Sequence, residues 1–387
     1  MASRGCRRGE CTVKKQISVL TALLTAAAFA VTGCGASGDN AAPSDSSKAA
    51  SQEVPEETEH SEAESTEAEN TGAETGSEAV SEEEKEGSGA SAVRVGSLKG
   101  PTSMGLAYLM ETAKNGETAN TYEFTMAGKA DELVGNIANG SLDIALVPAN
   151  VASVLYNKTQ GQVKVIDINT LGVLYVVASD DSISTMEDLK GKTVYMTGKG
   201  TTPEFAMNYL LAENGLGSGD VTMEFKSEAA EVASILKEDP SAIGVLPQPF
   251  ASAACMQNPE LKTVMDLTEQ WDLLNKEGKS RMVTGVTIVR TGFLEEHEAA
   301  VEQFLKDHAE SAEYTSAEPE KAAQLVADIG IVEKAAMAQK AMPLCNIVCI
   351  TGEEMKQALS GYLEVLSGQD AKSIGGTLPG DDFYYLP

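Results

Sequence analysis

The sequence predicts an α/β fold of two doubly wound lobes of about 100 residues each, joined by two crossing strands. Short apolar strands alternate with helical patterns over about 295 residues, which is typical of largely parallel sheets covered by helices. This length exceeds one usual domain, and part of the pattern occurs twice. We therefore expect two similar lobes that face each other across a ligand cleft.

The first lobe begins with clear strand and helix patterns. VRVGSL (93–98) and LDIALVPA (142–149) are short apolar runs of the kind that form buried strands. Between them, ADELVGNIANG (130–140) places leucine, valine and isoleucine on one helical face. A strand, a helix and a strand in this order indicate a βαβ unit.

An internal repeat appears when the chain is shifted by 99 residues. IALVPANVAS (144–153) then falls on IGVLPQPFAS (243–252), and VIDI (165–168) falls on VMDL (264–267). One residue away from this register, Lys99-Gly100 recurs as Lys199-Gly200. The pattern favours two copies of one architecture, although convergence on common βα patterning is the alternative.

The repeat changes register near its end. LGVLYVV (171–177) is similar to TGVTIVR (284–290), so the second copy carries about 14 extra residues, which include the only tryptophan, Trp271. A long strand at the end of each copy can carry the chain to the other lobe, and we expect these crossings at 171–179 and 282–291. The predicted domain boundaries are 93–180 with 285–387 for the first lobe, and 181–284 for the second.

Residues 1–34 are predicted to be a lipoprotein signal peptide. Basic residues precede an uncharged apolar run at 17–31, which is too short for a spanning helix and typical of a secretory signal. VTGC (31–34) is similar to the bacterial lipobox, which makes Cys34 the predicted lipid attachment site on the outer face of the bacterial cytoplasmic membrane. Translation begins either at Met1 or near Val13.

Residues 35–92 are predicted to form a disordered acidic tether. They contain almost no large apolar side chain, so they cannot bury enough surface to offset chain entropy. The formal charge of −29 divides into +4 in the leader, −14 in the tether and −19 in the remainder. Because the remainder is this acidic, it is a poor candidate for binding nucleic acid or anionic lipid, and we expect a monomer.

Three cysteines remain after the leader is removed: Cys255, Cys345 and Cys349. An odd number in an exported protein argues against a disulfide scaffold. The β-branched residues of CNIVCI (345–350) indicate an extended segment that holds its two cysteines too far apart to bridge. We expect buried free thiols.

With these features, the chain resembles extracytoplasmic solute-binding proteins of ABC importers, in the two-lobed class that includes sulfonate, nitrate and thiamine-precursor binders. The resemblance runs from about Val93 to the C-terminus and depends on LKGPTSMG, LDIALVPANVAS, LKGKTVYMTGKGTTPEFA and GVLPQPFA in this order, together with the lipobox. It implies a type II periplasmic-binding-protein fold and a small organic ligand captured between closing lobes. It also implies an ABC permease and its ATPase as partners.

The resemblance also implies ligand loops after the first three strands of each lobe. The residues expected to bind ligand there are Lys99, Gly100, Thr102, Ser103, Gly128, Asn150, Gly198, Lys199, Gly200, Thr201, Thr202, Gln248 and Phe250. Trp271 is added because it lies in the extra residues of the second copy and offers a flat apolar surface. Each has a plainer interpretation: the lysines are solvated, Thr102 and Thr202 cap helices, and the two aromatic residues belong to the core.

The segment YMTGKGTTPEFAMNYLL (195–211) is not a phosphate-binding loop, because Lys199 precedes Gly200 instead of following it. Unpaired amides at a helix start nevertheless suit an anion or a carbonyl oxygen. The six loops contain no arginine, although arginine is the usual partner of carboxylate and phosphate groups. We therefore expect a neutral or singly charged ligand.

Enzymes of menaquinone or thiamine-pyrimidine pathways share this fold, and so do surface sensors that do not transport. His297 and His308 are expected on a late helix, away from every strand end, and Cys255 has no histidine partner. The sequence therefore predicts no catalytic residues, no metal ligands and no cofactor. Sequence does not separate a sensor from an importer component.

Overall fold

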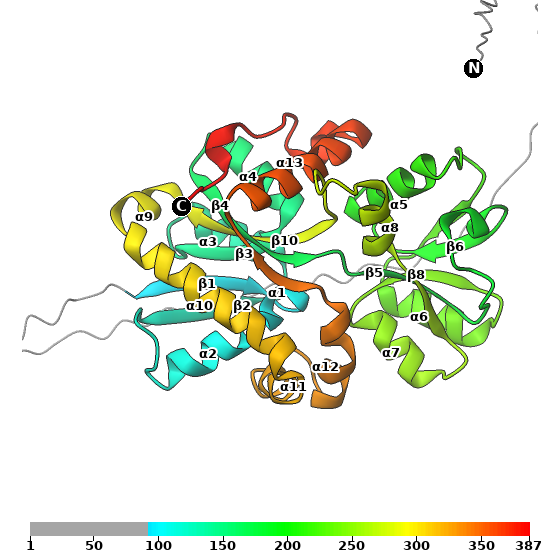
Figure 1. Ribbon diagram of the computed structural model, residues 1–387, viewed down its shortest axis with the longest axis horizontal. Helices are drawn as coiled ribbons and strands as arrows, with labels where there is room; N and C mark the ends of the chain where they lie inside the picture. Colours follow the sequence, from blue (N-terminus) through cyan, green and yellow to red (C-terminus); the bar gives the residue numbers. More distant parts are fainter. Residues whose placement is uncertain (1–91) are drawn as a thin grey trace, which may run out of the picture. The chain divides into compact units, whose positions relative to one another are not determined.

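The computed structural model describes residues 92–387 (Figure 1). The predicted signal peptide, Cys34 and all but the last residue of the predicted tether lie outside the described residues. Within 92–387, no helix combines the length and the apolar character needed to cross a membrane.

The first of two sheets has six strands in the order β11-β4-β10-β3-β1-β2. β1 is parallel to both of its neighbours, while β10 is antiparallel to β3 and β4. The strands are β1 (Val93–Leu98), β2 (Tyr122–Ala127), β3 (Ile144–Pro148), β4 (Val163–Leu171), β10 (Val283–Arg290) and β11 (Ile347–Ile350).

The second sheet has five strands in the order β7-β6-β8-β5-β9. β6 is parallel to its neighbours, and β5 is antiparallel to β8 and β9. The strands are β5 (Leu174–Ala178), β6 (Thr193–Met196), β7 (Thr222–Phe225), β8 (Ile243–Pro247) and β9 (Lys262–Asp266).

Apart from β11, which has no counterpart in the second sheet, the two sheets have the same strand order, as the 99-residue repeat predicts. β6, β7, β8 and β9 take the places in the second sheet that β1, β2, β3 and β4 take in the first. The fifth strand is exchanged: β10 follows the second copy but lies between β3 and β4, and β5 follows the first copy but lies between β8 and β9. Each lobe is therefore completed by a strand from the other copy.

The crossing between lobes is shorter than the sequence predicts. β4 ends at Leu171 in the first sheet and β5 begins at Leu174 in the second, so only Gly172 and Val173 connect them. A side chain at Gly172 would collide with Thr268, which explains the glycine at this point. β5, at 174–178, lies in the range expected for the first lobe but pairs only with strands of the second sheet. The return crossing runs through 275–282 to β10.

Most helices cover the first sheet. The helices of the first lobe are α1 (Pro101–Met104), α2 (Ala107–Lys114), α3 (Ala130–Ala138), α4 (Ala149–Thr159), α9 (Thr291–Glu296), α10 (Glu298–Ala317), α11 (Pro319–Asp328), α12 (Ala335–Ala341) and α13 (Gly352–Gln369). The second lobe has α5 (Thr202–Glu213), α6 (Ala229–Glu238), α7 (Phe250–Gln257) and α8 (Leu267–Leu274). Short 3₁₀ turns are η1 (Met186–Leu189), η2 (Met342–Leu344), η3 (Ala371–Ile374) and η4 (Asp381–Phe383).

The C-terminal helices pack back on the first lobe, as the sequence predicts. α10 contacts α2 and β11, and α13 contacts β4 (Figure 1). Two further contacts reach the second lobe, because α12 touches α7 and α13 touches α5. A hydrogen bond of 2.7 Å from the Tyr175 hydroxyl to the Leu344 carbonyl adds a polar connection.

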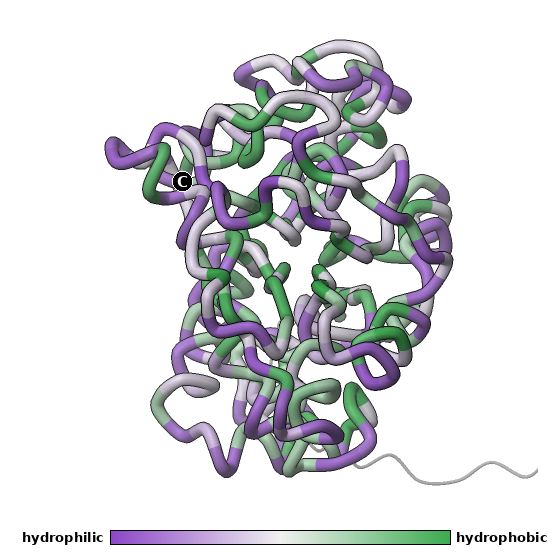
Figure 2. The backbone as a smooth tube through the Cα atoms, turned by 90° about the vertical axis from the view of Figure 1, so that its right-hand side faces the viewer, coloured by the Kyte–Doolittle hydropathy of each residue, from purple (hydrophilic) through white to green (hydrophobic). Residues whose placement is uncertain are grey.

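One apolar cluster runs through both lobes. It includes Val165 and Val286 of the first sheet, Val176 and Val245 of the second, and Trp271. The hydrophilic stretches lie mainly on outer turns of the backbone (Figure 2). Since burial of apolar surface is the main driving force of folding, the shared core ties the lobes together near the crossing.

Candidate ligand site

The carboxyl ends of the first sheet's parallel strands lie along one edge. Leu98 pairs with Ala127 at the ends of β1 and β2. Pro148 at the end of β3 pairs with Gly285, near the start of the antiparallel β10. Because β4 runs antiparallel to β10, its end at Leu171 also lies at this edge.

The second sheet presents the same edge to the crossing. Met196 and Phe225 pair at the ends of β6 and β7, and Pro247 at the end of β8 pairs with Leu174 at the start of β5. The link Gly172–Val173 therefore joins the carboxyl edge of one sheet to that of the other. Loops at such edges are where open α/β sheets bind ligands.

Both carbonyls of this link are hydrogen-bonded, one to each lobe. The Asn346 side-chain amide donates to the Gly172 carbonyl at 2.6 Å, and the Gln248 backbone N–H donates to the Val173 carbonyl at 2.9 Å. Asn346 precedes β11 of the first sheet, whereas Gln248 follows β8 of the second. The link is thus held in place from both sides.

The loop Lys99–Ser103, here called the first jaw, follows β1 and directs its hydroxyls into the protein. The Thr102 hydroxyl donates to the Leu98 carbonyl at 2.8 Å. Ser103 is fully buried, and its Oγ lies 2.7 Å from both the Leu98 carbonyl oxygen and the Ser97 hydroxyl. Lys99 and Gly100 are the accessible part of this jaw. The side chains of Thr102 and Ser103, expected to bind ligand, serve internal hydrogen bonds in this structure.

The loop Gly198–Thr202, here called the second jaw, follows β6 and is more exposed. Gly198 and Gly200 have φ angles of 86° and 70°, which only glycine adopts readily. The Thr201 hydroxyl donates to the Gly198 carbonyl at 2.6 Å, and the Gly200 N–H donates to the carboxylate of Glu204 at 2.5 Å. α5 begins here at Thr202, with Thr201 at its N-cap position. The Gly200 amide, one residue before this N-cap, therefore already holds a carboxylate.

The other expected loop residues are dispersed along the two edges. Gly128 is exposed directly after β2. Asn150 lies in the first turn of α4 and donates to the Ser373 carbonyl at 3.3 Å. Phe250 is 43 % exposed and borders a cavity of about 300 Å³ between α6 and α7. Of these three, only Gly128 lies exposed directly beyond the end of a parallel strand.

Trp271 lies in the core, which corrects its place among the expected ligand contacts. Its side chain is fully buried, and its ring centroid is 4.4 Å from that of Tyr209 on α5 and 5.4 Å from that of Tyr362 on α13. The indole N–H donates to the Ser280 hydroxyl at 3.2 Å. Trp271 therefore packs between α5 of the second lobe and α13 of the first.

Two buried polar atoms beside the link have no hydrogen-bond partner among residues 92–387. They are the Nε2 of Gln248, a residue 3 % exposed, and the Oγ1 of Thr268, a residue 6 % exposed. Gln248 bonds the link through its backbone, and Thr268 is the residue that a side chain at Gly172 would strike. Buried groups without partners are rare and costly, which points to a ligand or solvent contact here.

Thr268 was missed by the sequence analysis, although the repeat contains the signal that finds it. The shift of 99 places Thr268 on Asn169, which is also buried and polar at the end of its strand. The Asn169 amide, unlike Thr268, is satisfied, since it donates to the Thr287 hydroxyl at 3.2 Å and accepts from that of Thr170 at 2.9 Å.

The positively charged side chains in the loops that follow the strands are lysines. One lysine follows each of β1, β2, β6 and β7: Lys99, Lys129, Lys199 and Lys226. The Lys199 ammonium lies 5.9 Å from the Phe225 ring centroid, and that of Lys226 lies 5.2 Å from the Tyr195 ring centroid.

The arginines of the described chain are engaged elsewhere. Arg94 and Arg290 both bind Asp143, at 2.6 and 2.7 Å, and Arg281 binds Asp272 at 3.3 Å. Lys226 is also ion-paired, with Glu224 at 3.2 Å. Lys99, Lys129 and Lys199 thus supply the positive charge available to a ligand at the two edges.

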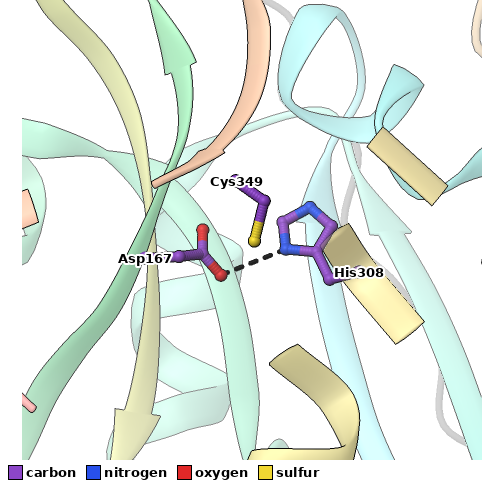
Figure 3. Close-up of side chains that lie close together, drawn as sticks. All are labelled: Asp167, His308 and Cys349. Carbon is purple, nitrogen blue, oxygen red and sulfur yellow. Dashed lines mark hydrogen bonds and ion pairs between the residues drawn. The ribbon is translucent and has the colours of Figure 1, made fainter. Parts of the chain in front are cut away.

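His308 lies on α10, a late helix, as expected, but two side chains that the sequence did not associate with it lie beside it. Its Nδ1 lies 3.0 Å from an oxygen of Asp167, and Cys349 lies beside both (Figure 3). Burial would lower the pKa of His308, but the Asp167 carboxylate outweighs it and raises this pKa to about 10. The group joins β4, α10 and β11 within the first lobe and was missed because its members are far apart in sequence.

Comparison with known proteins identifies the class. Residues 107–318 match the family described as the periplasmic substrate-binding protein of phosphonate ABC transporters. The chain belongs to this family. It is therefore a periplasmic substrate-binding protein of an ABC transporter, a class that binds a small solute and interacts with a permease, and that is not a class of enzymes. No curated protein sequence matches the chain.

Solved structures show the same fold at low sequence identity. An ABC transporter structure from Parabacteroides distasonis is 22 % identical, with a TM-score of 0.64 over 76 % of this chain and 98 % of its own. The aliphatic sulphonate binding protein of Escherichia coli is 16 % identical, with a TM-score of 0.60 over 76 % and 92 %.

A sulfonate-binding protein described from Methylobacillus flagellatus is also 16 % identical, with a TM-score of 0.53 over 76 % and 91 %. These likenesses confirm the predicted two-lobed type II fold. The shared fold by itself does not identify the ligand of this chain.

Proposed function

We propose that this substrate-binding protein captures a small organic anion between the two sheet edges at which the parallel strands end, and that it delivers this anion to an ABC importer. The observation that carries the proposal is the pair of unpartnered buried atoms, Gln248 Nε2 and Thr268 Oγ1, beside the link that joins the edges. A donor amide and a hydroxyl at this point suit an oxygen-rich headgroup.

The ligand class follows from the charges at the edges. The residues from Ser91 onward carry a net −19, yet four strand-end loops each contain a lysine, and one of these lysines, Lys226, is paired with Glu224. Glycine amides of the two jaws add donors to these point charges. A singly charged oxyanion such as a sulfonate or a phosphonate monoanion fits this set, and the known relatives are named for these two groups.

The proposed contacts are the accessible groups of the predicted set. They are Lys99, Gly100, Gly128, Gly198, Lys199, Gly200, Thr201 and Thr202, together with the amide of Gln248. A ligand that touches both jaws is bound better by a closed form and shifts the population toward it. Closure would bend the chain at Gly172–Val173 and at 275–282, and a smaller radius of gyration with ligand is its expected sign in solution scattering.

The ligand class is tested by calorimetric titration with three probes of similar size: ethanesulfonate, ethylphosphonate and the neutral ethyl methyl sulfone. We expect the sulfonate or the phosphonate to bind at least tenfold more tightly than the sulfone. Equal affinity for all three would contradict a charged headgroup.

The site itself is tested by Gln248→Leu, which removes the unpartnered Nε2 at similar side-chain volume. Its Nε2 has no protein partner, but its Oε1 accepts the Ser252 N–H at 3.3 Å, so we expect a small loss of unfolding free energy, about 1 kcal/mol. We expect affinity to fall about tenfold, the effect of one lost hydrogen bond to a charged group. The matched control is Gln257→Leu, at the exposed end of α7, which should keep the affinity. Unchanged binding by Gln248→Leu would move the ligand away from the link.

We further propose that the protein acts as a monomer anchored through lipid on Cys34, with the acidic tether holding the body clear of the membrane. The support is the leader pattern and the VTGC segment. Cys34→Ser should release the body into the medium or leave the signal uncleaved. Normal processing with full membrane retention would contradict the anchor.

A further inference from the structure

Three side chains of different chemistry meet inside the first lobe, away from the ligand edges. Asp167 comes from β4, His308 from the middle of α10 and Cys349 from β11. One donor atom of each, an oxygen, a nitrogen and a sulfur, lies within 4.8 Å of the others. Asp167 and His308 are fully buried, while Cys349 is half-buried. The fold thus brings together three of the ligand types that zinc takes in proteins.

The geometry is not that of a nucleophile and its base. In such a pair, one ring nitrogen faces the nucleophile and the other is held by the carboxylate. Here the Cys349 sulfur lies on the side of the ring where Nδ1 meets Asp167, and Nε2 points away (Figure 3). Nε2 is 3.7 Å from the position that a side chain at Gly105 would occupy. All three donors therefore converge on one point instead of forming a relay.

We propose that Asp167, His308 and Cys349 bind one soft divalent cation of the Zn²⁺ class. A thiolate, a carboxylate and a neutral imidazole carry a total charge of −2, which a divalent cation neutralises, so the occupied site adds no net charge to the interior. Thiolate and imidazole select zinc-like ions over Mg²⁺ and Ca²⁺, which require more oxygen ligands.

The surroundings fit such a site. The second oxygen of Asp167 accepts the Thr287 hydroxyl at 2.7 Å, which fixes the orientation of the carboxylate as outer-shell bonds do in metal sites. Cys349 also lines a surface cavity of about 400 Å³ with Glu302, Lys306 and Thr351, which offers a path from solvent to the sulfur. Three protein donors leave a fourth tetrahedral position for water.

Binding has a defined proton requirement. The Cys349 thiol must lose its proton, and Nδ1 of His308 must give up the proton that it shares with Asp167. Both protons compete with the cation, so the affinity should rise with pH and binding should acidify a weakly buffered solution. No redox step is involved.

The test uses the full chain, stripped of metal with a chelator and titrated with Zn²⁺ by calorimetry and with Co²⁺ by optical absorption. We expect one equivalent of Zn²⁺ to bind, and a cobalt–thiolate absorption band to appear. Cys349→Ser should remove the band and weaken Zn²⁺ binding at least about tenfold. The matched control is Cys255→Ser, a half-buried free thiol of the second lobe, which should keep both signals.

These measurements distinguish metal bound at Cys349 from metal bound elsewhere on the chain. The acidic tether and Cys34 are present in every variant, so metal bound there does not distinguish Cys349→Ser from Cys255→Ser. Absence of the cobalt–thiolate band from the unmodified chain would overturn the proposal without any variant having to fold. Equal Zn²⁺ affinity in the two serine variants would overturn it as well. Neither outcome depends on the solute bound at the jaws.

Discussion

The two jaws hold equivalent places at the ends of β1 and β6, yet their polar groups act in opposite ways. In the first jaw, the Thr102 and Ser103 hydroxyls point inward and bond the Leu98 carbonyl. In the second jaw, Thr201 is exposed, and the Gly200 amide faces a surface carboxylate. The two copies share the strand order and the Lys-Gly pair, but in the first jaw the hydroxyl-bearing residues Thr102 and Ser103 are buried. The first jaw is therefore built as a fixed wall, and the second as an adaptable one.

This difference lies in the loops and not in the helices behind them. α5, which the second jaw opens, is held by contact of Tyr209 with Trp271, and Trp271 in turn contacts Tyr362 on α13 of the first lobe. One buried indole thus connects the second jaw's helix to the first lobe. Any mobility of the second jaw must then come from its glycines, Gly198 and Gly200.

The largest expected effect tests this packing. Trp271→Ala should lower the free energy of unfolding by about 3–5 kcal/mol, the range for emptying a buried aromatic position. Phe250→Ala is the control, since that ring is 43 % exposed, and it should change stability by less than about 1 kcal/mol. Urea unfolding followed by circular dichroism measures both. A small loss in Trp271→Ala would mean that α5 is held by other contacts and that the lobes are not joined through the indole.

The next effect compares the hydroxyls of the jaws directly. Ser103→Ala removes a fully buried hydroxyl and leaves that of Ser97 with one partner fewer, so we expect a loss of about 1–3 kcal/mol of unfolding free energy. Thr201→Ala removes an exposed hydroxyl from a loop bond and should cost less than about 1 kcal/mol. Equal losses in chemical denaturation would contradict the division into a fixed and an adaptable jaw.

Sequence predicted the repeated features of this fold well, because they are set by local patterning. The strand at 93–98, the helix from Ala130 and the helix start at Thr202 each follow from apolar period, glycine or proline placement. The shift of 99 residues also anticipated the strand order that the two sheets share, apart from the additional β11 of the first sheet. The exact crossing could not be predicted, because apolar residues continue through Gly172 and only tertiary pairing decides that β5 joins the second sheet.

Side-chain roles were harder to predict than strands, because a polar or aromatic residue near a strand end can face either way. Trp271 and Ser103 turned inward, and nothing in their neighbouring residues distinguishes this from exposure. The meeting of Asp167, His308 and Cys349 depends on β4, α10 and β11 packing together, which no local pattern encodes. Thr268 is different, since its match to Asn169 in the repeat was available from the sequence.

The smallest expected effect concerns Glu204, an acidic residue that has no counterpart beside the first jaw. Its carboxylate accepts the Gly200 N–H just before α5, where an anionic headgroup would bind in our proposal. In the register that aligns Lys199 with Lys99, the matching residue of the first copy is the buried Met104. Glu204→Gln keeps the size and removes the charge, so affinity for ethanesulfonate should rise about two- to fivefold, the equivalent of 0.3–1 kcal/mol for one charge at a helix start.

The control for this comparison is Glu213→Gln, because Glu213 is exposed at the far end of the same helix and changes the net charge equally. Titration calorimetry at two salt concentrations should show the gain of Glu204→Gln shrink as salt screens the charge, with little change in Glu213→Gln. If Glu204→Gln instead weakens binding, the carboxylate orders the second jaw and does not compete with the ligand. The second jaw would then be preorganised by the Glu204 carboxylate, as the first is by its buried hydroxyls. Both jaws would be fixed walls, and they would differ only in the group that holds them.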